Sequence, residues 1–373
     1  MSRLNELIQR LCPNGVEFIM LIDICKITIG EFVHKNKQTE EGKYPVFNGG
    51  KNHTGYYEEF NNDGNKVIIS ARGANAGYVN RVFTRYWAGN SCYSISPLND
   101  NYLNWLFLYY SLKNEEKKFM GNQQTGSIPA ISKKQIEQIK IPIPPLDVQN
   151  EIVRILDTFT SHTAELQAEL QARKEQYEYY RNKLLTFEKD DKNVKWMKLG
   201  ELCEIYTGGE PPKCTIKGNF KDEEHPYPIW ANGKDIYGYS STYKINKDAV
   251  VISSIGANTG TVYYRKAYFT PIIRLKVLVP KDKTILSKYL YYYLSTISIV
   301  VKSSSVPNIN ANEVKKMQVP ILPICVQQRI VSILDKFEAL VNDLTEGIPA
   351  EIAAVQEQYE YYRNKLLTFK QRA

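Results

Sequence analysis

Apolar residues recur at alternating steps of four and three residues between Val148 and Phe187, a stretch that contains neither Gly nor Pro. This spacing places them along one narrow line of an α-helix, as in a coiled coil, and not on the wider face of an ordinary surface helix. Asp147 follows a Pro-rich segment and is predicted to be the N-cap residue. A helix of this length spans about 60 Å at 1.5 Å per residue.

A second stretch, from Val326 to Phe369, repeats the same pattern with four additional residues. The insertion adds one step of four, and Gly347 and Pro349 fall within it, so a local break in the helix is predicted there. We expect the two helices to pair with each other in antiparallel orientation. The residues predicted to form the contact are Leu156, Phe159, Leu166, Leu170, Tyr177, Tyr180 and Leu184 in the first helix, and Leu334, Phe337, Val341, Val355, Tyr359, Tyr362 and Leu366 in the second.

The two helices belong to a longer internal repeat. EQYEYYRNKLLTF occurs identically at 175–187 and 357–369, and KIPIPPLDVQNEIVRILDTF (140–159) returns as QVPILPICVQQRIVSILDKF (318–337). Upstream, YPVFNGGK (44–51) matches YPIWANGK (227–234), and VIISARGANAGYV (67–79) matches VVISSIGANTGTV (250–262). Because the order and the spacing of these segments are preserved, the whole half of the chain is duplicated.

The part of each half before the long helix differs between the two copies and is predicted to form a mixed α/β lobe. β-Branched runs end in Gly- and Asn-containing turns, which is typical of strands, and the apolar runs 103–112 and 286–294 are predicted to be buried helices. The predicted organisation is a first lobe at 1–147, a long helix at 148–188, a second lobe at 189–324 and a second long helix at 325–373. We expect the N-terminal segment to pack with the C-terminal helix.

The positive charge of the chain lies on the lobes. The formal net charge is +8, while 148–187 carries −1 and 326–370 carries −2, so +11 remains on the rest of the chain. Basic lobes suit contact with DNA, since neutralisation of phosphates supplies much of the affinity of such contacts. A solvated basic surface without a polyanionic partner has the same composition.

Polar residues in the repeated turns are the candidates for reading DNA bases. Arg and Lys pair with guanine in the major groove, and Asn and Gln pair with adenine. A further pair of loops, 121–132 and 301–310, ends in the similar segments SIPAIS and SVPNIN but differs in the residues that precede them. The alternative role for any one of these residues is to stabilise a turn. The candidates are Asn48, Lys51, Arg72, Asn75, Gln123, Gln124 and Thr125 in the first lobe, and Asn232, Lys234, Ser254, Asn258, Ser303, Ser304 and Ser305 in the second.

The sequence contains no recognisable catalytic constellation. It has no adenine-methyltransferase NPPY-type loop, no GxxxxGK[ST] phosphate loop, and neither GxSxG nor HExxH. The six cysteines lack CxxC spacing and do not cluster with the four histidines, so neither a metal nor a cofactor is expected. The N-terminus lacks the apolar run of a signal peptide, and no stretch is long enough to span a bilayer. We therefore expect a non-catalytic cytoplasmic protein.

These features together resemble the specificity subunit of type I restriction–modification systems. The resemblance covers the whole chain and is carried by the duplicated PxPPLxxQxxIVxILDxF segment (first copy 142–159), the QYEYYRNKLL motif and the GAN-x-G turns at 73–77 and 256–260. In the second copy the Pro-Pro pair is replaced by Leu322-Pro323.

The resemblance implies two α/β target-recognition domains separated by an antiparallel two-helix coiled coil, an internal tandem repeat with pseudo-two-fold symmetry. Each domain would read one half of a bipartite sequence in double-stranded DNA. The helices would act as a spacer and dock two methyltransferase (modification) subunits, and restriction (endonuclease/translocase) subunits could join the complex. The alternatives are a coiled-coil adaptor protein and a free-standing DNA-binding regulator. An adaptor would show no salt-dependent affinity for DNA.

Overall fold

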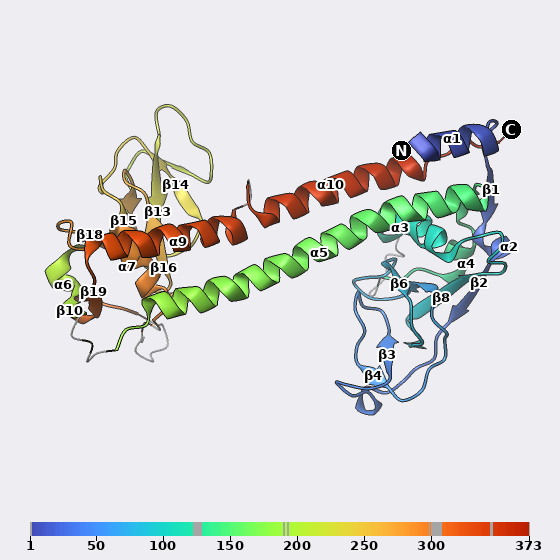
Figure 1. The fold of residues 1–373 in the computed structure, drawn as a ribbon, viewed down its shortest axis with the longest axis horizontal. Helices are drawn as coiled ribbons and strands as arrows, with labels where there is room; N and C mark the ends of the chain where they lie inside the picture. Colours follow the sequence, from blue (N-terminus) through green and yellow to red (C-terminus); the bar gives the residue numbers. More distant parts are fainter. Residues whose placement is uncertain are drawn as a thin grey trace. The chain divides into compact units, whose positions relative to one another are not determined.

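The computed structural model describes residues 2–121, 129–188, 191, 194–297, 299, 308–343 and 346–372 (Figure 1). The chain forms two compact units. Unit 1 comprises Met1–Gln167 and Ile352–Ala373, and unit 2 comprises Ala168–Glu351. Each unit contains one α/β lobe together with segments of the long helices.

The lobe of unit 1 is built on a four-stranded antiparallel sheet in the order β2-β8-β5-β6. Its strands are β2 (Cys25–Ile29), β5 (Lys66–Ser70), β6 (Val79–Val82) and β8 (Cys92–Pro97). A smaller sheet has the order β4-β3-β7, and β1 pairs with β9. The remaining elements are β1 (Glu17–Met20), α2 (Leu21–Ile24), η1 (Lys35–Lys37), β3 (Tyr44–Phe47), β4 (Tyr56–Tyr57), β7 (Trp87–Ala88), α3 (Trp105–Gly121), α4 (Lys133–Glu137) and β9 (Lys140–Ile143).

The lobe of unit 2 repeats this topology. Its four-stranded sheet has the order β11-β18-β15-β16, and β10 pairs with β19 as β1 pairs with β9. The second sheet, β12-β14-β13-β17, contains the same parallel pairing, since β13 pairs with β17 as β3 pairs with β7. The elements are β10 (Lys195–Lys198), α6 (Leu199–Leu202), β11 (Cys203–Thr207), β12 (Thr215–Lys217), β13 (Tyr227–Trp230), β14 (Ile236–Ser240), β15 (Ala249–Ile252), β16 (Val262–Arg265), β17 (Thr270–Pro271), β18 (Lys276–Pro280), α7 (Ser287–Leu294), α8 (Ala311–Lys316) and β19 (Gln318–Ile321). The predicted fold class, α/β lobes in tandem repeat with long helices, is confirmed.

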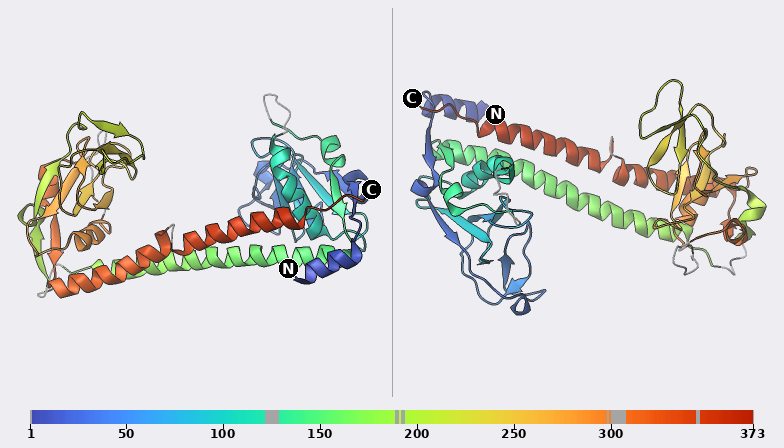
Figure 2. Two further views of the ribbon diagram at one scale, coloured as in Figure 1. Left: turned by 90° about the horizontal axis from the view of Figure 1, so that it is seen from above. Right: turned by 180° about the vertical axis from the view of Figure 1, so that it is seen from behind.

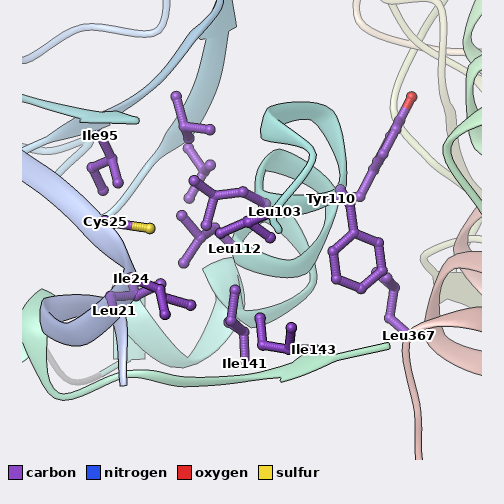
Figure 3. Close-up of a cluster of buried hydrophobic side chains, with 14 of the residues drawn as sticks. Leu21, Ile24, Cys25, Ile95, Leu103, Tyr110, Leu112, Ile141, Ile143 and Leu367 are labelled. Atoms are coloured by element: carbon purple, nitrogen blue, oxygen red, sulfur yellow. The ribbon is translucent and has the colours of Figure 1, made fainter. Parts of the chain in front are cut away.

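The hydrophobic core of each lobe lies between its four-stranded sheet and several helices, and it includes residues of the long helices. In unit 1, Leu21 and Ile24 of α2, Ile95 of β8 and Leu112 of α3 point into one cluster (Figure 3). The apolar runs predicted to be buried helices correspond to α3 and α7, whose tyrosines and leucines are largely buried. In unit 2 the equivalent cluster contains Tyr289 of α7 together with apolar residues of β15 and β18.

The long helix predicted in the first half is α5 (Leu146–Leu185). It begins before Asp147, which lies in the first turn, so the prediction of Asp147 as N-cap was wrong. The second long helix is broken where the sequence indicates, into α9 (Ile324–Asn342) and α10 (Ile348–Leu366). Pro349 is accommodated because the first-turn N–H groups of a helix have no acceptor within the helix.

Within each unit, α5 packs against part of the second helical stretch (Figure 2). In unit 1 the ring of Phe159 stacks on Tyr362 of α10 with centroids 5.5 Å apart, and in unit 2 Tyr180 stacks on Phe337 of α9 at 5.7 Å. The start of α5 thus contacts the end of α10, while the end of α5 contacts α9, which is antiparallel order. Of the residues predicted to form this contact, Leu156, Leu166, Leu334, Val341, Val355 and Leu366 are buried, Phe159, Leu170, Tyr177, Leu184, Phe337, Tyr359 and Tyr362 are half-buried, and Tyr180 is 37% exposed.

The two ends of the chain meet in unit 1. The N–H of Val16 donates to the carbonyl of Lys370 (2.9 Å), and the N–H of Arg372 donates to the carbonyl of Val16 (2.9 Å). Gly15 has φ +88°, and a Cβ there would lie 2.4 Å from the carbonyl oxygen of Lys370. Leu4 of α1 (Ser2–Leu11) belongs to the same core as Leu366. The N-terminal helix is therefore fastened to the C-terminal end of α10.

None of the helices that the structure describes has the length and apolar character needed to cross a membrane.

Thiol labelling distinguishes two classes of cysteine. Cys12, Cys25, Cys92 and Cys203 are buried, whereas Cys214 and Cys325 are exposed. Burial raises the pKa of Cys25 and of Cys203 to about 12, so these thiols stay protonated and unreactive. We expect iodoacetamide at pH 8 to modify only Cys214 and Cys325 in the native protein, and all six cysteines in denaturant, as measured by peptide mass spectrometry. Native labelling of Cys25 or Cys203 as fast as that of Cys214 would contradict the buried positions.

Candidate nucleic-acid interface

Three segments that are distant in the sequence come together on the lobe of unit 1. They are residues 48–51 after β3, residues 71–78 between β5 and β6, and residues 129–131. Ser70 Oγ donates to the carbonyl of Gly50 (3.1 Å), the N–H of Gly73 donates to Pro129 (2.9 Å), and the N–H of Ile131 donates to Ala71 (2.9 Å). We call this group the lobe 1 loop cluster.

The lobe of unit 2 brings the matching segments together: residues 231–234, 253–261 and 308–309. Ser253 Oγ donates to the carbonyl of Asn232 (2.7 Å), and the N–H of Ile309 donates to the carbonyl of Ser254 (3.0 Å). This is the lobe 2 loop cluster. The repeated turns that the sequence singles out therefore converge at the same place in both lobes.

The glycines of the GAN-x-G turns adopt a backbone conformation that other residues rarely adopt. Gly73 and Gly77 have φ +89°, and Gly256 and Gly260 have φ +87° and +91°. A Cβ at Gly73 or at Gly256 would meet nothing within 4 Å, so the positive φ, and not lack of space, explains glycine at these two positions. The N–H of the second glycine of each turn donates to the carbonyl of a strand-end serine, Ser70 or Ser253 (2.8 Å in both), and this closes the turn.

Four of the candidate base-reading residues are exposed on the loop clusters: Lys51, Arg72, Lys234 and Asn258. Asn75 is half-buried. The ammonium of Lys51 lies 5.6 Å from the ring centroid of Tyr78. These side chains are accessible to a ligand that approaches the clusters.

Asn48 and Asn232 use their side-chain amides within the lobes. Asn48 Oδ1 accepts a hydrogen bond from the N–H of Ser91 (3.2 Å). Asn232 Oδ1 accepts from the N–H of Ser254 (2.8 Å), and its Nδ2 donates to the carbonyl of Ile273 (2.5 Å). The geometry favours the alternative role, stabilisation of the turn, for both asparagines.

Ser254 was wrongly predicted to read a base. Its side chain is fully buried, and its Oγ donates to the carbonyl of Arg274 (2.6 Å). It follows β15, all four residues of which are buried, so the side chain enters the lobe and not the surface. The remaining candidates, Gln123, Gln124, Thr125, Ser303, Ser304 and Ser305, lie outside the described residues.

A basic hollow adjoins the lobe 2 loop cluster. Its volume is about 800 Å³, and its lining includes Lys234, Arg265, Lys266 and Lys288 together with Glu338. Lys288 Nζ lies 2.7 Å from a carboxylate oxygen of Asp335, which neutralises that charge locally. The hollow retains an excess of positive charge, which suits a phosphate backbone.

Each lobe is joined to its long helix by one buried glutamine, for which no role was predicted from the sequence. Gln149 Nε2 donates to the carbonyls of Tyr102 (3.0 Å) and Pro144 (2.7 Å), and its Oε1 accepts from the N–H of Asn104 (2.8 Å). Both Gln149 and its counterpart in α9, Gln327, are fully buried. The sequence signal was the recurrence of this glutamine in both copies of the PxPPLxxQ segment.

Gln327 makes the same three bonds in unit 2. Its Nε2 donates to the carbonyls of Thr284 (2.9 Å) and Leu322 (2.8 Å), and its Oε1 accepts from the N–H of Leu286 (2.9 Å). The contact therefore does not depend on the Pro-Pro pair of the first copy, because Leu322 offers its carbonyl in the place of Pro144.

A tyrosine and an aspartate provide a second connection between lobe and helix. In unit 1, the hydroxyl of Tyr110 and the guanidinium of Arg81 (2.8 Å) both donate to Asp157 Oδ1 on α5. In unit 2, the hydroxyl of Tyr292 donates to Asp335 Oδ1 on α9 at 2.6 Å. Burial raises the pKa of both tyrosines, so each hydroxyl stays protonated and remains a donor.

A tandem pair of α/β lobes, each with an exposed polar loop cluster and each fastened to a long paired helix, defines a two-lobed recognition protein. The family model of the type I restriction modification DNA specificity domain matches the chain twice, at residues 13–176 and 191–354. The chain belongs to this family of type I restriction–modification specificity subunits, as the sequence resemblance predicts.

Curated relatives and solved structures agree with this assignment. A putative type I specificity subunit of Mycoplasma pneumoniae is 32% identical over 85% of this chain and 97% of its own length. The specificity subunit of a type I restriction enzyme from Escherichia coli is 36% identical over 74% of this chain and 73% of its own length. The crystal structure of the S subunit of a type I restriction–modification system from M. genitalium shares the fold, with a TM-score of 0.67, 20% identity, and coverage of 95% of this chain and 97% of that one.

Proposed function

We propose that this chain selects the DNA sequence on which a type I restriction–modification complex acts. Each lobe reads one half of a bipartite target in double-stranded DNA, and the long helices set the spacing and dock two methyltransferase subunits. The chain itself is a non-catalytic recognition subunit without a metal or cofactor, and restriction subunits can join the complex. It works in the cytoplasm, where the DNA and these partner subunits are found.

The observation that carries this proposal is that one loop arrangement is built twice with different side chains. Each cluster consists of the same three segments on the same sheet topology. The exposed Arg72 of the lobe 1 cluster corresponds in the repeat to Ile255 of the lobe 2 cluster. A different side chain at one position of a shared frame is what two different half-sites require, because base edges differ in their donors and acceptors.

Comparison of methylated DNA tests the function directly. We expect deletion of the gene to abolish adenine methylation at one motif made of two short half-sites around a fixed gap, as measured by single-molecule sequencing of genomic DNA. Re-expression of the wild-type chain should restore methylation at the same motif. Retention of every methylated motif in the deletion strain, with the methyltransferase subunits present, would contradict the proposed function.

A further inference from the structure

The backbone of the loop that carries Lys51 is held by two side chains of the central sheet. Ser70, at the end of β5, donates to the carbonyl of Gly50 (3.1 Å), and Asn80 Nδ2, from β6, donates to the carbonyl of Lys51 (3.1 Å). The same Asn80 accepts the N–H of Arg81 through its Oδ1 (2.8 Å), which fixes the orientation of the amide. Two consecutive carbonyls of an exposed loop are thereby fixed.

The loop that carries Lys234 is held at the same place by a different side chain. Ser253 donates to the carbonyl of Asn232 (2.7 Å), and Arg265 Nη2 donates to the carbonyls of Gly233 (3.2 Å) and Lys234 (3.3 Å). The Arg265 guanidinium lies 3.5 Å from the ring centroid of Trp230. Burial lowers the pKa of Arg265 to about 10, which leaves it charged at neutral pH.

In both lobes the serine donates to the loop, although in unit 2 it reaches the carbonyl one position earlier in the repeat, and the second donor differs. The serine occupies matching positions in the repeated VIIS and VVIS strands, whereas the second donor is a neutral amide at one position of β6 and a guanidinium at another position of β16. The serine is present in both lobes, as is the sheet topology that supports the loops. The second donor varies between lobes, as does the sequence that each lobe is proposed to read.

We infer that Asn80 and Arg265 are positioning residues that determine the base preference of their own lobes by fixing the backbone of the Lys51 and Lys234 loops. The inference rests on the proposed function. A loop fixed before binding loses little conformational entropy on contact with DNA and presents its side chains in one geometry. A loop released from its donor presents them in several geometries, so it discriminates less well between a correct and an altered base.

Two variants remove these donors with little change in shape. Arg265→Met keeps an unbranched apolar stem against Trp230 and removes the guanidinium. Asn80→Asp is isosteric, retains the acceptor for Arg81, and replaces the donor to Lys51 by a second acceptor. Each variant complex, assembled with its methyltransferase subunits, would methylate two duplex libraries, each randomised in one half-site.

We expect each variant to relax one half-site only. Discrimination between the correct base and a single substitution should fall about tenfold, equivalent to about 1.4 kcal/mol, in the half-site read by the altered lobe. Arg265→Met and Asn80→Asp should relax opposite half-sites. If Arg265→Met does not yield a complex, Arg265→Lys keeps the charge but loses the planar fork, and the same result is expected.

Lys266→Met is the matched control, since it removes an exposed positive charge adjacent to Arg265. Loss of a phosphate contact weakens binding to all sequences alike, so this control should leave the base preference of both half-sites unchanged. Wild-type preference in Arg265→Met and Asn80→Asp, or equal relaxation of both half-sites by either variant, would overturn the inference. A wild-type complex without any bipartite preference would instead contradict the proposed function.

Discussion

Simultaneous replacement of Lys183 and Lys365 by glutamate is expected to yield a folded chain that retains neither methyltransferase subunit. Each single replacement should leave a complex with one methyltransferase subunit in place of two. The two lysines occupy the same position in the two identical copies of EQYEYYRNKLLTF, one in α5 and the other in α10.

The reason is an exposed helix face that is identical in both copies although packing does not require it. Five positions of the repeated segment are exposed in both helices at spacings of three and one residues, which places them on one side of the helix. They are Glu175, Glu178, Tyr179, Asn182 and Lys183 in α5, and Glu357, Glu360, Tyr361, Asn364 and Lys365 in α10. Two identical exposed faces suit two copies of one partner.

The tyrosine–lysine pair of this face has the same geometry in both copies. Tyr179 and Tyr361 are each 59% exposed, and the lysine ammonium lies 5.6 Å from the tyrosine ring centroid in both helices. Tyrosine is enriched in protein interfaces and among the residues that contribute most to binding.

Uniform copying of the helical repeat does not explain this identity, because exposed positions in the earlier turns of the repeat, in α5 and α9, differ. Arg154, Thr158, Ser161 and His162 in α5 correspond to Ser332, Lys336, Ala339 and Leu340 in α9, and all eight are exposed. A partner that contacts the repeated face, and not the earlier turns, would account for this difference.

Native mass spectrometry of the co-expressed subunits measures the stoichiometry. Truncation of one partner of a buried, hydrogen-bonded charge pair in an interface costs about 2–5 kcal/mol. Lys336→Glu is the control, because it makes the same change at an exposed position that differs between copies, and it should retain two methyltransferase subunits. A complex of the double variant that still holds two of them would show that docking uses another surface.

The long-range organisation was predictable from sequence because it depends on periodicity and repetition. The alternating steps of four and three located α5, and Gly347 marked the separation of α9 from α10. Such signals are local or recur at a fixed interval, so they do not require knowledge of the three-dimensional contacts.

The roles of individual polar residues were not predictable in this way. Asn48 lies 43 residues from Ser91, with which it bonds, and Asn232 lies 41 residues from Ile273. An asparagine in a turn can serve the turn or a ligand, and only the folded partners decide between the two. The burial of Ser254 was equally hidden, because β15 is buried along its whole length and shows no alternation.

Gln149→Ala is expected to destabilise the lobe of unit 1 by about 3 kcal/mol or more, because it leaves three backbone groups unpaired in a buried site, each costing about 1–3 kcal/mol. Hydrogen exchange of the β5 and β8 amides should report the loss, while β15 and β18 of the other lobe stay protected.

Gln327→Ala should show the reverse pattern, because its three bonds lie in unit 2. Gln171→Ala, at an exposed glutamine of α5, should change stability by less than about 0.5 kcal/mol. Equal loss of protection in both lobes after Gln149→Ala would show that the lobes unfold together and that the glutamine does not act on its own lobe alone.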